Sequence, residues 1–484
     1  MAGLFLYGPP GSGKTTLGRV LAGRLAQSFE DLDETIAAHA GCSIPEIFAA
    51  SGEKGFRARE RAALEKACAA PDRVVALGGG ALLDPACRAM AEARATVLCL
   101  DVPAEVLKAR ISAQAGTRPL ADAAEKVDRL LAARGPHYAS FPVRVTEHFA
   151  IDAGDEPSDI FVGTGLLDTV GTWVAARNPR ARVVVTGDEN TFPLYGARVR
   201  ASLERAGLAV SSCVIPAGEA GKTVETVGRI WQAFLSAGLD RRDFAVSVGG
   251  GVTGDLTGFA AATWMRGMRW VTVPTTLLAM VDASTGGKTG FDLPEAKNMI
   301  GAFHAPSFVL ADTQVLKTLP ARERGCGVAE SIKHALIADP GMLEAWSAPE
   351  ITPVLVARSL AVKVKIVTED AREHGVRAKL NLGHTVGHAV EIATGFAVKH
   401  GEAVSIGTVE EARLAVRLGL ASAEWPARVA AWFAAAGLPT ELPAGLTFEA
   451  LTETMRRDKK KQGKNILFAL PCAPGDVRLV PVAL

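Results

Sequence analysis

The chain has 484 residues, a length that predicts two to four domains rather than a single hydrophobic core. Apolar residues make up 48% and charged residues 22% of it, which is typical of a globular enzyme. Its 53 basic and 52 acidic residues give a net charge of +1, which argues against a nucleic-acid or membrane partner. Seven scattered cysteines without CxxC spacing indicate free thiols. No signal-like or membrane-length apolar run is present, so we expect a cytoplasmic protein.

The first 155 residues alternate short apolar runs with helical patterns, which indicates a parallel sheet covered by helices. Apolar runs at 4–7, 74–77 and 96–100 predict strands, and the first leads into a GxxxxGK[ST] motif. Amides of such a loop surround phosphates, its lysine reaches the terminal phosphates, and its hydroxyl binds magnesium. We therefore expect ATP and Mg²⁺ at Gly8, Gly11, Ser12, Gly13, Lys14, Thr15 and Thr16.

Further polar residues follow this loop in an order that suggests an acceptor site. Asp31 and Asp33 have a spacing that suits a magnesium contact and a hydroxyl acceptor, although a solvated helix cap is the alternative. A glycine triplet at 78–80 ends a predicted strand and allows a ligand to approach the backbone. Arg57, Arg118 and Arg134 add positive charge, although a lone arginine is more often a surface cation.

This order of motifs resembles shikimate kinase over the first 150 residues. The resemblance implies that Asp33 holds the substrate hydroxyls and acts as the base, and that Arg118 lies on a lid over ATP. It also implies a shikimate site made of Asp33, Arg57, Gly79, Gly80 and Arg134. Bidentate arginine suits a small carboxylate. Gluconate and nucleoside-monophosphate kinases are alternatives, but the arginine pair and the glycine triplet favour a compact carboxylate acceptor. The lid at 116–121 is less basic than we would expect.

A polar segment with Gly and Pro at 153–159 predicts a linker, after which a new βα series begins at Ile160. Segments 182–186 and 244–248 are predicted to be buried strands. The glycines at 249–251, followed by Gly254 and Asp255, fit a dinucleotide pyrophosphate, although the signal is weak without GxGxxG. After about residue 325 long segments such as 357–369 and 404–418 predict a mainly helical part.

The second part also carries a candidate metal site and a group of basic residues. His384 and His388 are one helical turn apart and share a face, but no Glu follows His384 as it does in zinc proteases. Glu330, His384 and His400 would form an oxygen and nitrogen site suited to zinc, with positions left open for a substrate. A structural role for each histidine is the alternative. The neighbouring lysines and amides indicate an anionic substrate.

Taken together, these segments resemble 3-dehydroquinate synthase over about residues 160–484. The resemblance implies Zn²⁺ or Co²⁺ on Glu330, His384 and His400, with His388 contacting substrate instead of metal. Its implied substrate pocket comprises Asp282, Lys288, Lys297, Asn298, Lys333, Lys363, Glu373, Arg377, Asn381 and His388, with Arg266 and either Lys459 or Lys460 at the phosphate. Its implied NAD contacts are Asp188, Glu219, Lys222, Gly250, Gly251, Asp255, Thr275, Thr276, Lys288 and Lys297. Ala283 stands where a second serine is usual.

The combined expectation is an α/β protein with three parts. These are a P-loop kinase domain (1–155), an NAD-binding α/β domain (160–325) and a helical metal and substrate domain (326–484). The implied catalytic residues are Lys14 and Asp33 in the kinase, and Lys288, Glu373, Arg377, Asn381 and His388 in the synthase. The resemblances imply shikimate, ATP and a heptulosonate 7-phosphate as substrates, and a homodimer through the synthase part. The alternatives are a polyol dehydrogenase, a secondary-metabolic sugar-phosphate cyclase, and a catalytically inert module in one half.

Overall fold

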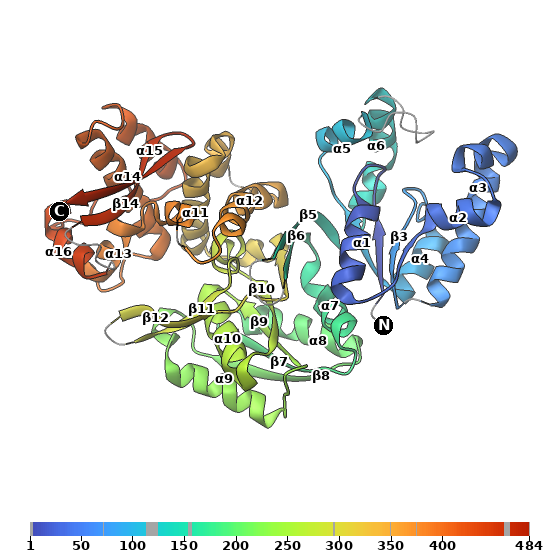
Figure 1. Ribbon diagram of the computed structural model, residues 1–484, viewed down its shortest axis with the longest axis horizontal. Helices are drawn as coiled ribbons and strands as arrows, with labels where there is room; N and C mark the ends of the chain where they lie inside the picture. Colours follow the sequence, from blue (N-terminus) through green and yellow to red (C-terminus); the bar gives the residue numbers. More distant parts are fainter. Residues whose placement is uncertain are drawn as a thin grey trace.

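A computed structural model describes residues 3–70, 72–112, 124–152, 157–293, 296–348, 350–373, 375–458 and 465–483. Its centre is an 11-stranded sheet with the order β2-β3-β1-β4-β5-β6-β13-β10-β9-β7-β8. Figure 1 shows the N-terminal residues at one end of the molecule and the C-terminal helices at the other. The α/β fold with a helical C-terminal part is as the sequence predicts. In the described ranges, no helix is both long and apolar enough to span a membrane.

The N-terminal half of the sheet is parallel throughout. Its strand β1 (Leu4–Tyr7) is fully buried between β3 (Val74–Ala76) and β4 (Thr96–Leu100). The outer strands are β2 (Phe29–Asp31) and β5 (Arg144–Ile151). The helices are α1 (Lys14–Leu25), α2 (Leu32–Ala40), α3 (Ile44–Ala69), α4 (Pro85–Arg94), α5 (Ala104–Ser112) and α6 (Ala124–Ala139). After β1 the chain forms β2 and β3 on one side of that strand, and it then crosses to β4 on the other side. The loop after β1 therefore lies where the strand order reverses, which is where parallel α/β sheets bind ligands.

The second half of the sheet is a separate parallel set. It contains β6 (Ser158–Thr164), β7 (Arg182–Asp188), β8 (Ala209–Ile215), β9 (Phe244–Gly249), β10 (Arg269–Pro274) and β13 (Phe308–Asp312). The helices α7 (Val170–Arg177), α8 (Ala197–Arg205), α9 (Val224–Ser236) and α10 (Gly251–Thr263) accompany it. The chain passes from β7 to the edge strand β8 and returns with β9. The strand order therefore reverses between β7 and β9, which predicts a ligand site at their carboxyl ends.

The two halves join through the antiparallel pair β5 and β6, whose register runs from Arg144 opposite Thr164 to Ile151 opposite Ser158. Ser158 and Asp159, expected in a linker, are the first residues of β6. One hydrophobic cluster contains Leu6 and Leu98 from the first half as well as Phe161 and Trp173 from the second. The two parts thus share a sheet and a core, and the carboxyl ends of their strands run in opposite directions along the β5–β6 ladder.

The remaining chain is mainly helical, as the sequence predicts. It comprises α11 (Ala321–Ala338), α12 (Pro353–Glu369), α13 (His384–Ala393), α14 (His400–Arg417), α15 (Trp425–Ala435) and α16 (Phe448–Asp458). Two hairpins were not anticipated: β11 (Lys288–Leu293) with β12 (Ala296–Phe303), and β14 (Asn465–Ala473) with β15 (Asp476–Ala483). Helix α12 packs against both β5 and β6, so the helical part contacts the large sheet where its two halves join (Figure 1).

Candidate active sites

The loop after β1 has the geometry of an anion site. Gly13 has φ +92° and precedes α1, which begins at Lys14 without a side-chain cap. The first amides of a helix lack partners within it and attract negative charge. Lys14 Nζ donates to the carbonyl oxygens of Gly8 and Pro9, both at 2.9 Å. Thr15 Oγ1 donates to Asp31 Oδ2 at 2.6 Å, so the two groups expected to hold magnesium are adjacent.

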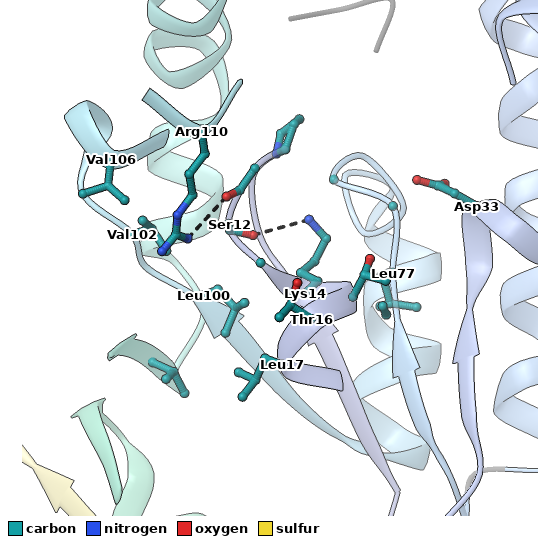
Figure 2. Close-up of a pocket in the computed structure, with 18 of the residues that line it drawn as sticks. Ser12, Lys14, Thr16, Leu17, Asp33, Leu77, Leu100, Val102, Val106 and Arg110 are labelled. Atoms are coloured by element: carbon teal, nitrogen blue, oxygen red, sulfur yellow. Dashed lines mark hydrogen bonds between the residues drawn. The ribbon is translucent and has the colours of Figure 1, made fainter. Parts of the chain in front are cut away.

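This loop opens into a pocket of about 1260 Å³. Figure 2 shows Asp33 on one side of Lys14, and Val102, Val106 and Arg110 on the other. The pocket brings together all the described side chains expected at the kinase site. Its lining includes Gly11, Ser12, Gly13, Lys14, Thr15, Thr16, Asp31, Asp33, Arg57, Gly79, Gly80 and Arg134. The expected lid residue Arg118 lies outside the described residues.

The Asp33 side of the pocket is built around Arg57 and a buried carboxylate that the sequence reasoning missed. Arg57 Nη1 donates to Glu60 Oε2 at 2.5 Å, and Glu60 is 3% exposed. Burial raises the pKa of Glu60, although Arg57 opposes this rise. A Cβ at Gly80 would collide with the Arg57 guanidinium, which explains the glycine there. The i,i+3 spacing of Arg57 and Glu60 on α3 was the available signal.

The residues expected to hold a dinucleotide lie where the strand order reverses, at the carboxyl ends of β7 and β9. Asp188 ends β7, and its Oδ1 accepts from the amides of Asn190 and Thr191 at 2.9 Å. Its Oδ2 accepts from Thr253 Oγ1 at 3.0 Å, which ties it to α10. Gly250 caps α10 without a side chain, and a Cβ there would lie 3.2 Å from Thr276 Cγ2. The strand ends thus place Asp188, Gly250 and Thr276 around one helix N-terminus.

A second group of expected NAD contacts surrounds Lys222, which is 4% exposed. Its Nζ lies 2.7 Å from Asp255 Oδ2 and donates to Asn298 Oδ1 at 2.6 Å. Burial raises the pKa of Asp255 to about 6, and Lys222 limits that rise. Lys297 Nζ lies 3.3 Å from Glu219 Oε1, so residues from the β11–β12 hairpin meet residues that precede α9.

The residues expected to hold a metal lie close together in the helical part. Glu330 is fully buried on α11, and its Oε1 lies 3.4 Å from His384 Nε2 and 3.3 Å from His400 Nε2. Tetrahedral zinc with bonds of about 2.1 Å places neighbouring ligand atoms roughly 3.4 Å apart. The three side chains therefore fit a zinc-sized ion, and they form one of the groups whose ligand atoms lie within 4.8 Å of one another.

Polar partners at the Nδ1 atom of each histidine fix the orientation of its ring. His384 Nδ1 lies 3.0 Å from the carbonyl oxygen of Leu382, and His400 Nδ1 lies 3.5 Å from Glu391 Oε2. Such partners leave each Nε2 for a metal. Burial opposes ionisation of Glu330, but Lys333 and the histidines hold its pKa well below the ordinary value, so it remains an anion. Glu391 was missed by the sequence reasoning, although it lies at i+3 from His388.

His388 also lies close to the expected ligands. Its ring centroid is 5.4 Å from that of His384 and 6.1 Å from that of His400. It forms a second possible ligand group with Glu391 and His400. Among the described residues, ligand geometry therefore offers two competing sets that share His400, and a third set of Asp282, Glu330 and His334 that shares Glu330.

Cationic side chains surround this centre, each paired with an acid. Lys363 Nζ donates to Asp282 Oδ1 at 2.6 Å, and Lys333 pairs with Glu330. Lys288 pairs with Glu373, whose Oε1 accepts from Asn381 Nδ2 at 3.0 Å. Two of these pairs, Lys363 with Asp282 and Lys288 with Glu373, join residues more than 80 positions apart in the sequence.

Arg377 is a further buried cation. It is 3% exposed and its Nη2 donates to the carbonyl oxygen of Gly286 at 3.4 Å. The buried Lys363 and Arg377 have pKa values lowered by burial, so an anion entering here would meet poorly hydrated cations.

Of the three residues expected near the substrate phosphate, the structure describes one. Arg266 is exposed in the turn after α10, at φ +66°. Lys459 and Lys460 lie outside the described residues. Ala283 lies against the glycine turn, since a Cβ at Gly251 would be 3.1 Å from the Ala283 Cβ. Its missing hydroxyl therefore faces the backbone of the expected NAD site.

Known families and proteins match both parts. Residues 10–160 match the family described as shikimate kinase, and residues 212–325 and 327–461 match the N-terminal and C-terminal families of 3-dehydroquinate synthase. A 3-dehydroquinate synthase of Symbiobacterium thermophilum is 43% identical over 342 residues, covering 68% of this chain and 96% of the relative.

Two solved structures resemble the second part. A 2-deoxy-scyllo-inosose synthase complexed with carbaglucose-6-phosphate, NAD+ and Co2+ has a TM-score of 0.64 at 25% identity, covering 70% of this chain and 97% of that one. A 2-epi-5-epi-valiolone synthase from Streptomyces hygroscopicus subsp. jinggangensis, with NAD+ and Zn2+ bound, has a TM-score of 0.59 at 29% identity, covering 63% and 88%.

Proposed function

Because the chain belongs to the 3-dehydroquinate synthase family and carries a shikimate kinase domain ahead of it, we propose that it catalyses one reaction with each part. The first is ATP-dependent phosphorylation of shikimate to shikimate 3-phosphate. The second is conversion of 3-deoxy-D-arabino-heptulosonate 7-phosphate to 3-dehydroquinate and phosphate. Both serve chorismate and aromatic amino acid biosynthesis. The observation that carries the proposal is the Glu330, His384 and His400 set, which adjoins paired lysines in the same chain as a complete P-loop pocket.

In the kinase reaction, the P-loop amides and Lys14 hold the ATP phosphates, and Thr15 and Asp31 hold magnesium. Arg57 and Arg134 bind the shikimate carboxylate, because a guanidinium can donate two parallel hydrogen bonds to it. Gly79 and Gly80 leave room for the ring. Asp33 accepts the proton of the attacking hydroxyl from its position across the pocket from Lys14.

In the synthase reaction, Glu330, His384 and His400 hold Zn²⁺ or Co²⁺, and the cradle at Asp188 and Gly250 holds NAD. When bound, the metal polarises a substrate oxygen and NAD accepts and returns a hydride. The chain's own cations bind the substrate: Lys333, Lys363 and Arg377 are buried and face an anion without competing water. His388 and Asn381 orient the phosphate-bearing end, and the Lys288–Glu373 pair closes the pocket.

The proposed domain limits are 1–155, 160–325 and 326–484, with the kinase and synthase functions divided at the β5–β6 junction. We also propose that the synthase part forms a homodimer. Sedimentation of the full chain tests this, because a dimer has twice the 50.6 kDa mass of the chain.

Paired assays on the purified full chain test the two reactions. Shikimate should stimulate ADP formation, and the heptulosonate 7-phosphate should release phosphate, each without the other substrate. Absence of either signal rejects that half of the proposal. Reduced NAD should not accumulate during phosphate release, since the hydride returns to the substrate. A polyol dehydrogenase would instead form reduced cofactor in step with product.

The two structural relatives are named for other products, and one is complexed with carbaglucose-6-phosphate, so a sugar-phosphate cyclase of secondary metabolism is the second candidate function. The identity of 43% to a 3-dehydroquinate synthase, over 96% of that relative, favours the heptulosonate. The attached kinase domain favours it too, because both reactions then serve one biosynthetic route. Assaying the chain with heptulosonate 7-phosphate, glucose 6-phosphate and sedoheptulose 7-phosphate in parallel separates the readings.

A further inference from the structure

The kinase pocket does not end within the kinase part. Beyond Leu100, Val102 and Val106 its lining continues along β5, from Val145 to Phe149. It then continues onto α12, a helix of the synthase part, with Val354, Ala357, Arg358 and Ala361. One cavity of about 1260 Å³ is therefore walled by residues more than 200 positions apart in the sequence.

The strand register explains how a synthase helix reaches this pocket. The pairing of β4 with β5 comprises only Cys99 with Arg144 and Leu100 with Val145. From Glu147 to Ile151, β5 instead pairs with β6 alone. This length of β5 extends past the carboxyl end of β4, where the pocket opens, and α12 packs against it. The overhanging strand and α12 thus form a wall beside the phosphate loop.

The two ends of the pocket have different chemistry. Asp33 lies on one side of Lys14, and Val102, Val106 and Arg110 lie on the other (Figure 2). Arg57 and Arg134 belong to the Asp33 end, because all three side chains influence the pKa of the buried Glu60. ATP extends well beyond the loop that holds its phosphates. With the acceptor end reserved for the second substrate, the base and ribose must extend past Val102 and Val106, toward β5 and α12.

Arg358 supplies the polar group of the α12 wall. Its Nε and Nη2 donate to Asp339 at 3.0 and 2.8 Å, which fixes the guanidinium plane. A guanidinium has five N–H donors and a flat face that stacks on aromatic rings. Two of these N–H groups donate to Asp339. The other three N–H groups and the flat face of the guanidinium can contact a ligand.

We propose that α12 of the synthase part forms the outer wall of the kinase nucleotide site, and that Arg358 contacts the base or ribose of ATP. This inference rests on the proposed kinase reaction. It makes the synthase part a component of the kinase site, so that nucleotide affinity depends on a residue outside the kinase domain.

The test measures the ATP dissociation constant, the two kinase Michaelis constants and synthase phosphate release, in the full chain. Arg358→Ala should weaken ATP binding about tenfold, since a hydrogen bond from a charged group is lost. Ala361→Phe should weaken ATP binding by filling the pocket. Neither should change the Michaelis constant for shikimate. The matched control is Lys365→Ala, on the same helix but exposed and outside the pocket lining, which should bind ATP as the parent chain does.

The variant Asp339→Ala distinguishes a direct contact between Arg358 and ATP from a structural role of the Arg358–Asp339 ion pair. It removes the ion pair but keeps the guanidinium. The proposal expects this variant to lose less than about threefold in ATP affinity, the cost of a looser side chain. An equal loss in Arg358→Ala and Asp339→Ala overturns it, as does unchanged affinity in both Arg358→Ala and Ala361→Phe. If the parent chain shows no shikimate-dependent ADP formation, the proposed kinase function fails instead.

Discussion

The metal site yields the sharpest prediction, because two histidines one helical turn apart are assigned different roles. His384→Ala removes a group whose Nε2 lies 3.4 Å from Glu330 Oε1, at the separation expected for two ligands of one tetrahedral ion. His388→Ala removes a neighbouring imidazole that we assign to substrate. We expect the first substitution to abolish metal retention, and the second to leave the metal bound while reducing turnover.

The size of the effect can be worked out from the number of ligands. Losing a residue that hydrogen-bonds to a metal ligand lowers metal affinity about 10- to 100-fold. Losing one of three direct ligands should therefore lower it at least about 100-fold. At a metal concentration of about 100 times the parent dissociation constant, binding stabilises the parent chain by about 2.7 kcal/mol. A 100-fold weaker site at the same concentration gives only about 0.4 kcal/mol.

The assay compares thermal unfolding with zinc and with a chelator, together with metal content after dialysis. The parent chain and His388→Ala should gain similar stability from zinc, whereas His384→Ala should gain almost none. If His388→Ala loses the zinc-dependent gain and His384→Ala keeps it, the ion is held by His388, Glu391 and His400 instead. Equal loss in both variants would also refute the division of roles.

Other outcomes follow from the same contacts. Lys14→Met should abolish shikimate-dependent ADP formation and spare phosphate release by the synthase; parallel loss of both would contradict two separate sites. Lys288→Ala should raise the Michaelis constant for the phosphorylated sugar by a larger factor than the NAD dissociation constant, because the resemblance assigns this lysine to both ligands and only the sugar brings a phosphate monoester; titration of both ligands checks this. Asp159→Ala should lower the free energy of unfolding by about 1–3 kcal/mol, because His148 loses its hydrogen-bond partner at the buried junction of the two halves while Arg24 keeps Asp152; an unchanged urea midpoint would count against it. Asp255 has a pKa of about 6, so it becomes neutral below that pH and Lys222 loses an ion-pair partner; NAD affinity should fall as the pH drops through 6, and Asp255→Asn should lack this step.

The sequence predicts those parts of the sites that lie on one local element. The P-loop is contiguous, and its strand and helix are visible in the pattern of apolar residues, so residues 8–16 could be placed without a structure. Lys14 and Thr15 are found where the motif predicts them, with Asp31 beside Thr15. The glycines after β9 cap α10 for the same reason.

Contacts between distant elements were not predictable from periodicity. Glu391 is a buried acid whose partners Lys297 and His400 lie on other elements. Glu60 has its partner Arg57 on the same helix, but its burial comes from tertiary packing. The helical spacing of His384 and His388 suggests a shared ligand face, yet Glu330 on α11 is close to His384 and His400, which lie on different helices. Only the family resemblance separated the two histidines by role.

The junction between the two halves of the sheet was the least predictable feature, because it depends on the pairing of two edge strands. Composition at 153–159 indicated a break, whereas Ser158 and Asp159 continue a hairpin that joins both halves. Since this pairing is antiparallel, the carboxyl ends of the two parallel sets point in opposite directions, so the phosphate loop after β1 and the glycine turn after β9 lie at strand ends that point away from each other. The candidate metal ligands lie on α11, α13 and α14 rather than at a strand end. What the two parts share is structural: a common core and α12, which carries Arg358 at the kinase pocket and Lys363 against Asp282. If Arg358 contacts ATP as proposed, the fusion acts on nucleotide binding through this shared helix.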